Sequence, residues 1–495
     1  MSSLPKVLDL HELSARDSFL GTLLPYLSQL GMGEIYLVGG YLRDHLLGQT
    51  SRDIDFITRA DPGLVASDVA GKYNGKYYLL HEEENAYRAI FSDDGRALTI
   101  DFSPIRGQSV EEDLSLRDFS INAMAVDVEQ LVEEERLRLP RDLIDKHYGW
   151  HDLSRRILRE CDNHTFLMDP VRLVRALRFR HTLGMDYEER TLNHMKKYAA
   201  LISKVPGERA AKELMEIFML SGSSKMFAEL EFNPVLQHLF PELLPTIGLE
   251  QNAYHHLDVW SHSLLTLDEL DNILADPVGI YPDFGAEILE HTQETLQDIW
   301  PRDAFLRLAA LYHDTGKAQT FSRDDSGRIH FYRHEIESSQ AIRDLAVRLR
   351  FSKKASDFLA AVLEKHMTIL LSMKQMPAPR NFTRMLHGLG NELVDVVLLS
   401  LADREATRGP MTSSENLRKY KEFCHGLLAE YYRAKETPAL LDGGDLISEL
   451  SIPQGPMVGE ILDEVRVAQL AGEVESKAEA MELARSLMLT KRGAE

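Results

Sequence analysis

Apolar residues follow two different spacings along this chain. Short runs rich in β-branched and aromatic residues predict strands near the start, at residues 35–38, 53–57, 77–80 and 98–102. From about Asp162 onward the apolar positions recur mostly at helical spacing, in stretches rich in Leu, Ala and charged residues. The pattern predicts an α+β fold, with a small mixed sheet in an N-terminal head and a long, all-helical remainder.

Three breaks in this pattern suggest where domains meet. The head ends near Asn163, a second break lies at residues 245–252, and Pro and Gly cluster at residues 437–444. We therefore expect a head at residues 1–162, a helical neck at 163–247, a helical domain at 248–436 and a small helical tail at 437–495.

Composition narrows the class of protein. With 44% hydrophobic and 27% charged residues the chain is an ordinary globular protein, which excludes collagen-like and disordered classes. The longest uncharged apolar stretch, about residues 396–402, is too short to span a bilayer, and the first residues lack a secretory apolar core. We therefore expect a cytoplasmic protein with no membrane partner. The net charge of −22 argues against a surface that binds polyanions everywhere, without excluding local basic patches.

Candidate chemistry begins where a predicted strand runs through Gly39 and Gly40 into a helix. Paired glycines let a phosphate approach the backbone at a helix N-terminus, although a tight turn explains them equally well. Asp53 and Asp55 stand at i and i+2 on the next strand, so their carboxylates share one face and could bind Mg²⁺. A solvated strand face would look the same. Asp101, on the last predicted strand, is a candidate third carboxylate or an edge residue.

Two further segments place polar residues in otherwise apolar surroundings. Arg117 could hold phosphate oxygens, whereas Asp118 and Asn122 either fix the local turn or reach a ribose hydroxyl. Asp169 precedes a proline and so signals a helix start. In the helix that follows, a cationic stripe of arginines repeats every third residue, and it is either solvated or directed at a triphosphate and a base; its members are Arg172, Arg175 and Arg178.

Together these segments resemble the class II tRNA nucleotidyltransferase and bacterial poly(A) polymerase family, over nearly the whole chain. LVGGYLRDHLLGQTSRDIDFIT resembles the family's first signature, RDFSINAMA its second, LIDKHYGWHDLSRRILR its connecting segment, and DPVRLVRALRFRHTLGM its base-reading helix. The resemblance implies a polymerase-β-like head that transfers CMP, AMP or both from CTP or ATP to the 3′ end of tRNA and releases pyrophosphate.

The resemblance also assigns roles to single residues. Asp53 and Asp55 would carry Mg²⁺, with Asp101 as the third catalytic candidate, and Asp169 and Arg172 would present hydrogen bonds to the incoming base. The candidate nucleotide-binding residues are Gly39, Gly40, Arg43, Arg117, Asp118, Asn122, Asp169, Arg172 and Arg175.

Two departures from the family pattern affect which nucleotide is added. Met168 stands where the base-reading motif usually has Glu. Only residues 105–116 separate the Asp101 strand from Arg117, so the flexible arm that many CCA-adding members carry there is trimmed. A short arm resembles members that add only the two C residues. The sequence leaves open whether C, A or both are added.

A second series of residues resembles the HD phosphohydrolase domain. The series runs His, His-Asp, His, His and Asp along the chain. Imidazole and carboxylate ligands in such a series can surround one or two divalent ions, here Mg²⁺, Mn²⁺, Ni²⁺ or Co²⁺. His255 and His256 are assigned to the surface or to a helix start. Some family members carry such a domain with phosphatase or 2′,3′-cyclic phosphodiesterase activity. The expected ligands are His262, His313, Asp314, His334, His366 and Asp403.

Two other functions fit parts of this pattern. A poly(A) polymerase of the same family would add A residues to unrelated RNA. An HD-type phosphohydrolase could use the head only to bind nucleotide, although the intact Asp53 and Asp55 pair argues against this. Basic side chains could hold tRNA phosphates or belong to solvated helix faces, as at Arg343, Arg348, Arg350, Lys353 and Lys354. DNA is not an expected partner.

Overall fold

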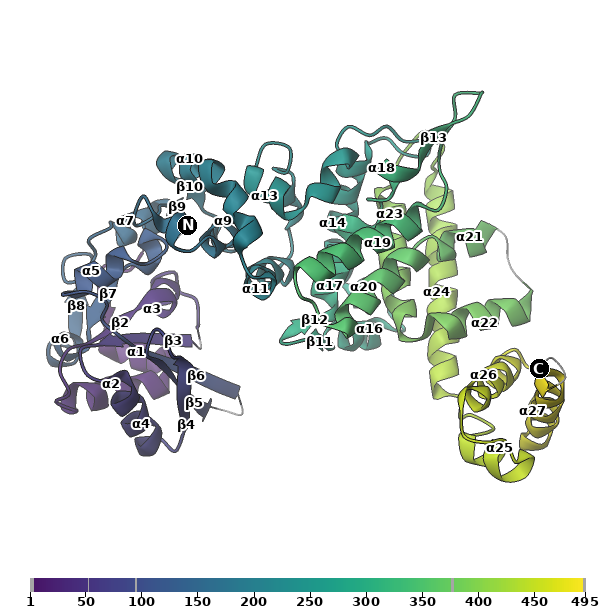
Figure 1. The fold of residues 1–495 in the computed structure, drawn as a ribbon, viewed down its shortest axis with the longest axis horizontal. Helices are drawn as coiled ribbons and strands as arrows, with labels where there is room; N and C mark the ends of the chain where they lie inside the picture. The colour runs from purple at the N-terminus through teal and green to yellow at the C-terminus, as the bar shows by residue number, and fades with distance from the viewer. Residues whose placement is uncertain (1–3, 52, 94–95, 375–377, 493–495) are drawn as a thin grey trace. The chain divides into compact units, whose positions relative to one another are not determined.

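The computed structural model describes residues 4–51, 53–93, 96–374 and 378–492, and it divides into two compact units, one up to Val205 and one from Pro206 onward. The α+β class is confirmed, because the main sheet lies in the first unit and helices dominate the second (Figure 1). The boundary between the units falls inside the expected neck at 163–247. The four-part division of the chain stays a prediction.

A mixed sheet of six strands forms the centre of the first unit, in the order β4-β5-β6-β3-β2-β7. β3 and β6 run parallel, and the other neighbours are antiparallel. The four predicted runs all lie in strands, whereas the pattern does not predict β5 or β7. The strands are β2 (Ile35–Val38), β3 (Asp53–Thr58), β4 (Lys76–His81), β5 (Ala86–Asp93), β6 (Arg96–Pro104) and β7 (Ala125–Asp127).

α4 shows how a helix of the first unit begins at a sequence signal and packs on this sheet. α4 starts at Pro62 after Asp61, whose carboxylate accepts hydrogen bonds from two backbone N–H groups, and it packs against β4, β5 and β6. The helices are α1 (Leu10–Arg16), α2 (Ser18–Gln29), α3 (Gly39–Leu46), α4 (Pro62–Lys72), α5 (Val110–Ser115), η1 (Ser120–Asn122), α6 (Val128–Glu134), α7 (Gly149–Arg155), α8 (Thr165–Met168), α9 (Val171–Leu183), α10 (Glu189–Tyr198) and η2 (Ala199–Lys204). Two short strand pairs complete the unit, β1 (Val7–Asp9) with β8 (Arg136–Arg138) and β9 (Ile157–Leu158) with β10 (Asp186–Tyr187).

The expected amphipathic pattern of α9 is confirmed. Leu173, Val174 and Leu177 are fully buried, while Arg172 and Arg175 stay partly exposed on the other face. The hydrophobic side of α9 therefore fixes the direction in which its arginines point.

The core of the second unit consists of long helices packed on one another: α14 (Val259–Ala275), α17 (Arg302–Tyr312), α19 (His334–Arg348), α20 (Lys353–Lys365) and α23 (Leu393–Ala406). The body is not purely helical, because two short antiparallel pairs interrupt it, β11 (Thr295–Gln297) with β12 (Trp300–Pro301) and β13 (Phe321–Arg323) with β14 (Ile329–Phe331). The remaining helices are α11 (Gly207–Phe218), α12 (Ser224–Phe227), α13 (Pro234–Leu239), η3 (Pro241–Thr246), α15 (Pro277–Ile280), α16 (Gly285–Thr292), α18 (Lys317–Thr320), α21 (Thr368–Lys374), α22 (Pro379–Leu389), η4 (Gly390–Glu392) and α24 (Ser414–Glu436).

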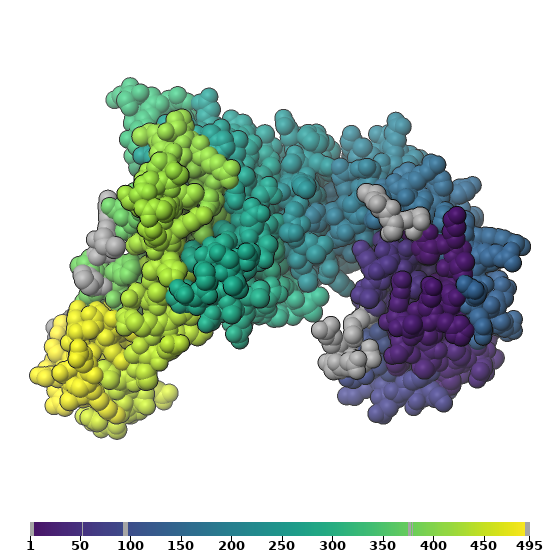
Figure 2. Space-filling model, turned by 180° about the vertical axis from the view of Figure 1, so that it is seen from behind, coloured from purple at the N-terminus to yellow at the C-terminus, as the bar shows by residue number. Residues whose placement is uncertain are grey.

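The last three helices, α25 (Gly443–Leu450), α26 (Pro456–Leu470) and α27 (Lys477–Arg492), share a hydrophobic core of their own. In Figure 2 they form a small lobe, drawn in yellow, next to the yellow-green α24. Glu464 on α26 accepts hydrogen bonds from Arg380 and Arg384 on α22, so ion pairs attach the lobe to the helical body.

One segment, residues 380–406, is long and apolar enough to cross a membrane by length and composition. However, 61% of its most apolar window is buried inside the protein, and the chain departs from helical geometry at Gly390, with φ +54°. The apolar side chains of α23 pack against α14, α17 and α20. We therefore interpret α23 as a core helix of this unit.

Candidate active site and metal cluster

Three carboxylates gather where β3 and β6 run side by side in the first unit. The parallel register places Asp55 directly beside Asp101, and Asp53 beside Thr99. The Thr99 hydroxyl donates a hydrogen bond to the Asp53 carboxylate. The alternation of side chains along β3 therefore brings Asp53 and Asp55 to one face, as their spacing predicts.

Asp101 differs from the other two carboxylates because a cation already holds it. Arg88, on β5, donates from Nε and Nη2 to the two oxygens of Asp101, at 2.7 Å each. This bidentate pair raises the pKa of Arg88. Sequence reasoning missed Arg88 because the contact depends on how β5 pairs with β6.

Asp55 is in an environment that disfavours its negative charge. Burial raises its pKa to about 6, and the negative charges of Asp101 and Asp53 add to this effect against the opposing charge of Arg117. Such a carboxylate is mostly ionised at pH 7 and gains from a nearby cation. The donor set of Asp53 and Asp55 therefore fits a divalent metal ion.

Gly39, the first residue of α3, lies directly against this cluster. Its φ of +77° is in the left-handed region, and an added Cβ would lie 2.7 Å from Asp55 Oδ2 and 3.4 Å from Arg117 Nη1. Only glycine meets both conditions without strain. Gly40 is less restricted, since its added Cβ would come no closer than 3.5 Å to Arg43.

We expect Gly39→Ala to destabilise the fold by about 2 kcal/mol and to remove most of the activity of this site, because the methyl group must displace the Asp55 carboxylate. Gly48→Ala is a matched control, since Gly48 has φ +75° but no atom within 4 Å of the added Cβ. Thermal unfolding and activity of both variants check the prediction. Equal activity of the two would show that contact with Asp55 is unimportant.

Residues of the second signature, RDFSINAMA at 117–125, take part in a connected hydrogen-bond network. Asn122 donates to Asp118 Oδ1 at 3.1 Å and accepts from Arg43 Nη1 at 2.7 Å, and Arg175 Nη1 donates to Asp118 Oδ2 at 3.2 Å. The Arg43 guanidinium also lies 5.1 Å from the ring centroid of Phe179. The network joins α3, η1 and α9, so Asp118 and Asn122 fix the local structure; contact with a ribose stays a prediction.

Charge in this network is balanced around Asp118. Burial alone would raise the pKa of Asp118, but Arg175 and the hydrogen bond from Asn122 outweigh it and hold the pKa below its usual value. Asp118 is thus ionised and keeps Arg175 in place.

Arg172 is held by backbone oxygens. Its Nη2 donates to the carbonyl of Leu116 at 2.8 Å and its Nη1 to the carbonyl of Arg117 at 3.3 Å. Burial lowers the pKa of Arg172. Asp169 accepts from the backbone N–H of Val171 at 3.4 Å, but α9 begins one residue later than predicted, with Pro170 in place of Asp169 as the N-cap residue. Met168 is 46% exposed.

The second basic group, in the helical unit, is partly engaged in local contacts. Arg343 pairs with Asp357 at 3.1 Å and Arg348 with Glu242 at 2.7 Å. These contacts explain the two arginines without RNA, and a role of the group in tRNA binding stays a prediction.

The six expected metal ligands of the second unit lie together on α14, α17, α19, α20 and α23 or at their ends, and all are buried or half-buried. Asp314 is central: Oδ2 lies 3.2 Å from His313 Nε2 and 3.6 Å from His262 Nε2, and Oδ1 lies 3.3 Å from His334 Nε2. His366 Nε2 is 3.3 Å from His334 Nε2. Ligand atoms close enough to share an ion form the groups His262–His313–Asp314 and Asp314–His334–His366.

Backbone carbonyls orient three of these histidines. The Nδ1 atom of His313 lies 2.8 Å from the carbonyl oxygen of Ala310. The Nδ1 atom of His334 lies 2.9 Å from the carbonyl oxygen of Phe331, and that of His366 lies 2.6 Å from the carbonyl oxygen of Leu363. Since only an N–H can donate to a carbonyl, each ring presents Nε2 to the centre. This is the arrangement that metal-binding histidines have in proteins.

Two observations test whether a metal fits this cluster. His313 Nε2 is buried and has no hydrogen-bond partner among the described residues. Burial, together with the neighbouring imidazoles of His334 and His313, lowers the pKa of His366 to about 3, so this ring is neutral and can act as a ligand at pH 7. Both observations fit a divalent ion held by imidazole and carboxylate groups.

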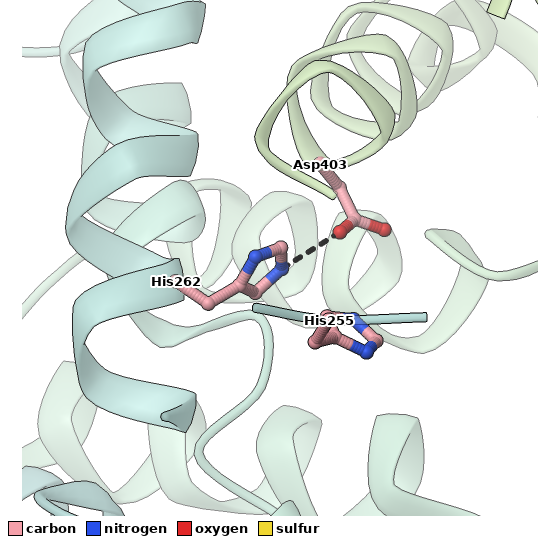
Figure 3. Close-up of side chains that lie close together, drawn as sticks. All are labelled: His255, His262 and Asp403. Atoms are coloured by element: carbon pink, nitrogen blue, oxygen red, sulfur yellow. Dashed lines mark hydrogen bonds and ion pairs between the residues drawn. The ribbon is translucent and has the colours of Figure 1, made fainter. Parts of the chain in front are cut away.

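The assignment of His255 to the surface or a helix start is wrong. His255 is half-buried, and its ring lies 4.9 Å from that of His262, near Asp403 (Figure 3). His262, His255 and Asp403 form a third group that could hold an ion, and His262 Nε2 lies 2.8 Å from Asp403 Oδ1. The residues preceding α14 fold back onto the cluster, which spacing alone does not reveal. His256 is exposed, as expected.

A cavity of about 580 Å³ opens onto this cluster. Asp314, His334 and Asp403 line it, together with the cationic side chains of Lys317 and Arg404. Lys317 Nζ donates to Asp314 Oδ2 at 2.6 Å, at the i+3 helical spacing that could have identified it from sequence. The cavity is large enough for a small phosphorylated ligand beside the metal ligands.

Comparison with known protein families gives three matches along the chain. The "Poly A polymerase head domain" matches residues 35–159, the "Probable RNA and SrmB-binding site of polymerase A" matches residues 184–246, and the HD domain matches residues 286–408. The HD match contains five of the six expected ligands, and His262 lies before it.

Relatives and solved structures cover almost the whole chain. The A-adding tRNA nucleotidyltransferase of Deinococcus radiodurans is 31% identical over 452 residues, which is 90% of this chain and 93% of the relative. The CC-adding tRNA nucleotidyltransferase of Thermus thermophilus is 28% identical over 460 residues, 90% of this chain and 92% of the relative. The fold is similar to that of the Thermotoga maritima CCA-adding enzyme complexed with tRNA, with a TM-score of 0.57, 20% identity and coverage of 99% of this chain and 100% of that one. Taken with the Asp53 and Asp55 pair beside Gly39, the match to these relatives shows that the chain belongs to the tRNA nucleotidyltransferase and poly(A) polymerase family.

Proposed function

We propose that this protein transfers CMP, AMP or both from CTP or ATP to the 3′ end of tRNA and releases pyrophosphate. The observation that carries the proposal is the placement of Asp53 and Asp55 on one face of the sheet, against the start of α3 and next to Arg117. The relatives that match this chain along nearly their full length are named tRNA nucleotidyltransferases. A cytoplasmic location is part of the proposal, since tRNA is the substrate.

The residues of the site divide the work of this reaction. Mg²⁺ held by Asp53 and Asp55 would favour ionisation of the attacking hydroxyl and screen the triphosphate. Arg117 would bind phosphate oxygens beside Asp55, and Gly39 would let the phosphates approach the N-terminus of α3. The network of Asp118 and Asn122 would hold the nucleotide-binding arginines in position, and Asp169 with Arg172 would read the base.

The experiment that tests the proposal uses tRNA ending before CCA, after C and after CC, each with CTP or ATP alone. The relatives include both A-adding and CC-adding enzymes, so the product is the informative result. The connection of residues 105–116 is short and packed, with Ile105, Val110 and Leu114 buried, and it favours an enzyme that stops after CC. Efficient AMP addition to tRNA ending in CC would contradict this preference but not the transferase proposal.

Base choice should depend on Arg172 and not on Met168. We expect Arg172→Ala to relax or abolish discrimination between CTP and ATP, whereas Met168→Ala changes it little, because an exposed thioether is a weak hydrogen-bond acceptor. Met168→Glu restores the usual family residue and should sharpen selection of C against A or extend the product by one nucleotide. Competition assays with both triphosphates measure this ratio, and unchanged discrimination in Arg172→Ala would contradict the assignment.

A poly(A) polymerase of the same family is the alternative for the head, and processive A addition to unrelated RNA would decide for it. For the helical unit we propose a second, metal-dependent phosphohydrolase activity, because the buried ligand cluster opens into a cavity with cationic side chains. Mg²⁺, Mn²⁺, Ni²⁺ and Co²⁺ are the candidate ions, since all accept imidazole or carboxylate ligands. A further alternative is that hydrolysis by the helical unit is the main activity. Full retention of tRNA extension in a variant that lacks the HD ligands would argue against it.

A further inference from the structure

A buried carboxylate outside the expected site holds one of its arginines. Asp113, on α5, is 1% exposed and uses its two oxygens for different partners. Oδ1 accepts from Nε of Arg106 at 2.8 Å and from its backbone N–H at 3.1 Å, whereas Oδ2 accepts from Nε of Arg117 at 3.3 Å. Asp113 therefore connects the start of the short 105–116 segment to Arg117, the first residue of the RDFSINAMA signature.

Arg117 lies between two carboxylates as a result. Its Nη1 and Oδ2 of Asp55 border the same point, the position that a Gly39 Cβ would take, at 3.4 and 2.7 Å. Burial raises the pKa of Asp55 and the charge of Arg117 only partly opposes it, and no hydrogen bond joins the two side chains among the described residues. The backbone of Arg117 is fixed as well, because its carbonyl accepts from Arg172.

We propose that Asp113 is a positioning residue for nucleotide transfer: it holds the Arg117 guanidinium beside the Asp53 and Asp55 pair and prevents Arg117 from pairing with Asp55. Arg117 then keeps its Nη groups directed at the phosphates, and Asp55 keeps its oxygens for the metal. The proposal rests on the proposed transfer function. It goes beyond it by giving a role to a residue that itself contacts neither nucleotide nor metal.

Physical chemistry makes a stable position for Arg117 necessary. A guanidinium forms strong, charge-assisted pairs with carboxylates within its reach, and a full ion pair with Asp55 would neutralise a metal ligand. Burial alone would raise the pKa of Asp113, but Arg117 and Arg106 outweigh it and keep this carboxylate ionised. Asp113 therefore competes for Arg117 throughout the neutral pH range.

The test measures CTP binding in the presence of Mg²⁺, together with the KM for CTP and kcat, in Asp113→Asn. The amide keeps the size of the side chain and can still accept a hydrogen bond from Arg106, but it loses the charge that holds Arg117. We expect CTP affinity to fall about 10- to 100-fold, the usual loss when a supporting partner of a metal or phosphate site is removed. On an Arg117→Met background the same change should have little further effect, because Asp113 acts through Arg117.

Two matched variants test whether Asp113 acts by positioning Arg117 or only by anchoring the segment 105–116. Arg106→Met removes the other partner of the same carboxylate, and Glu112→Gln changes an exposed neighbouring acid on α5. Both should bind CTP and transfer nucleotide like the wild type, with thermal unfolding as a check of the fold. Equal losses in Arg106→Met and Asp113→Asn, or independent effects of Asp113→Asn and Arg117→Met, would overturn the inference. If the wild type binds CTP but extends no tRNA, the proposed function fails while the binding comparison still decides the role of Asp113; a wild type that binds no CTP overturns both.

Discussion

Asp55→Ala reduces nucleotide transfer by at least about 1,000-fold and leaves the fold intact, because it removes a ligand whose charge no neighbouring residue can replace. Asp101 cannot take over, since both of its oxygens are engaged by Arg88. Single-turnover extension of tRNA measures the effect, and Asp53→Ala should behave in the same way. Incorporation at a near wild-type rate by either variant would contradict the metal assignment.

Replacing the same carboxylate with an amide has an unusual expected effect on stability. The pKa of Asp55 in the folded protein, about 6, lies above its unfolded value, so without metal the folded state binds the proton more tightly. The stability that Asp55 contributes is therefore present at low pH and is lost as the pH rises through about 6. Metal-free Asp55→Asn should accordingly be at least as stable as the wild type at pH 7. Asp101→Asn should be less stable, because it leaves Arg88 without its ion-pair partner.

Changing His313 and Asp314 together to Ala removes bound metal from the helical unit and abolishes any phosphatase or cyclic phosphodiesterase activity. Nucleotide addition should not change, because the two clusters belong to different compact units. Metal analysis after reconstitution with Mn²⁺, Ni²⁺, Co²⁺ or Mg²⁺ gives a readout that does not depend on knowing the substrate.

Neighbouring histidines supply the control for that experiment. His256→Ala removes an exposed imidazole and should retain the metal, whereas His255→Ala should weaken binding, because His255 lies in a ligand group with His262 and Asp403. A wild-type protein that retains none of the four ions would refute the metal assignment of this cluster.

Local patterns predicted much of the head and the shared face of Asp53 and Asp55, whereas the resemblance to the HD domain indicated the candidate ligands of the helical unit. The alternation along β3 indicated that Asp53 and Asp55 share a face, and the helical period of α9 separated its arginines from its core residues. Both signals lie within a few consecutive residues, where geometry follows directly from spacing.

The residues that sequence reasoning missed depend on contacts between distant segments. Arg88 meets Asp101 through strand pairing, and His255 reaches Asp403 because the residues preceding α14 fold back onto the cluster. A His-Asp dipeptide alone does not mark a metal site: Asp152 follows His151, as Asp314 follows His313, but its carboxylate accepts hydrogen bonds from Ser120 and Arg159. The three-dimensional structure distinguishes Asp152, whose carboxylate is bonded within the head, from Asp314, which lies among histidines.

The carbonyls that orient His313, His334 and His366 each belong to the residue three positions earlier in the chain. The last turn of a helix therefore aims the rings of His313 and His366, and the turn between β14 and α19 aims that of His334, without any ion. Formation of these turns then does not require an ion, unlike in small zinc modules that collapse only around their metal. An ion that binds there would meet ligand rings that are already aimed at it.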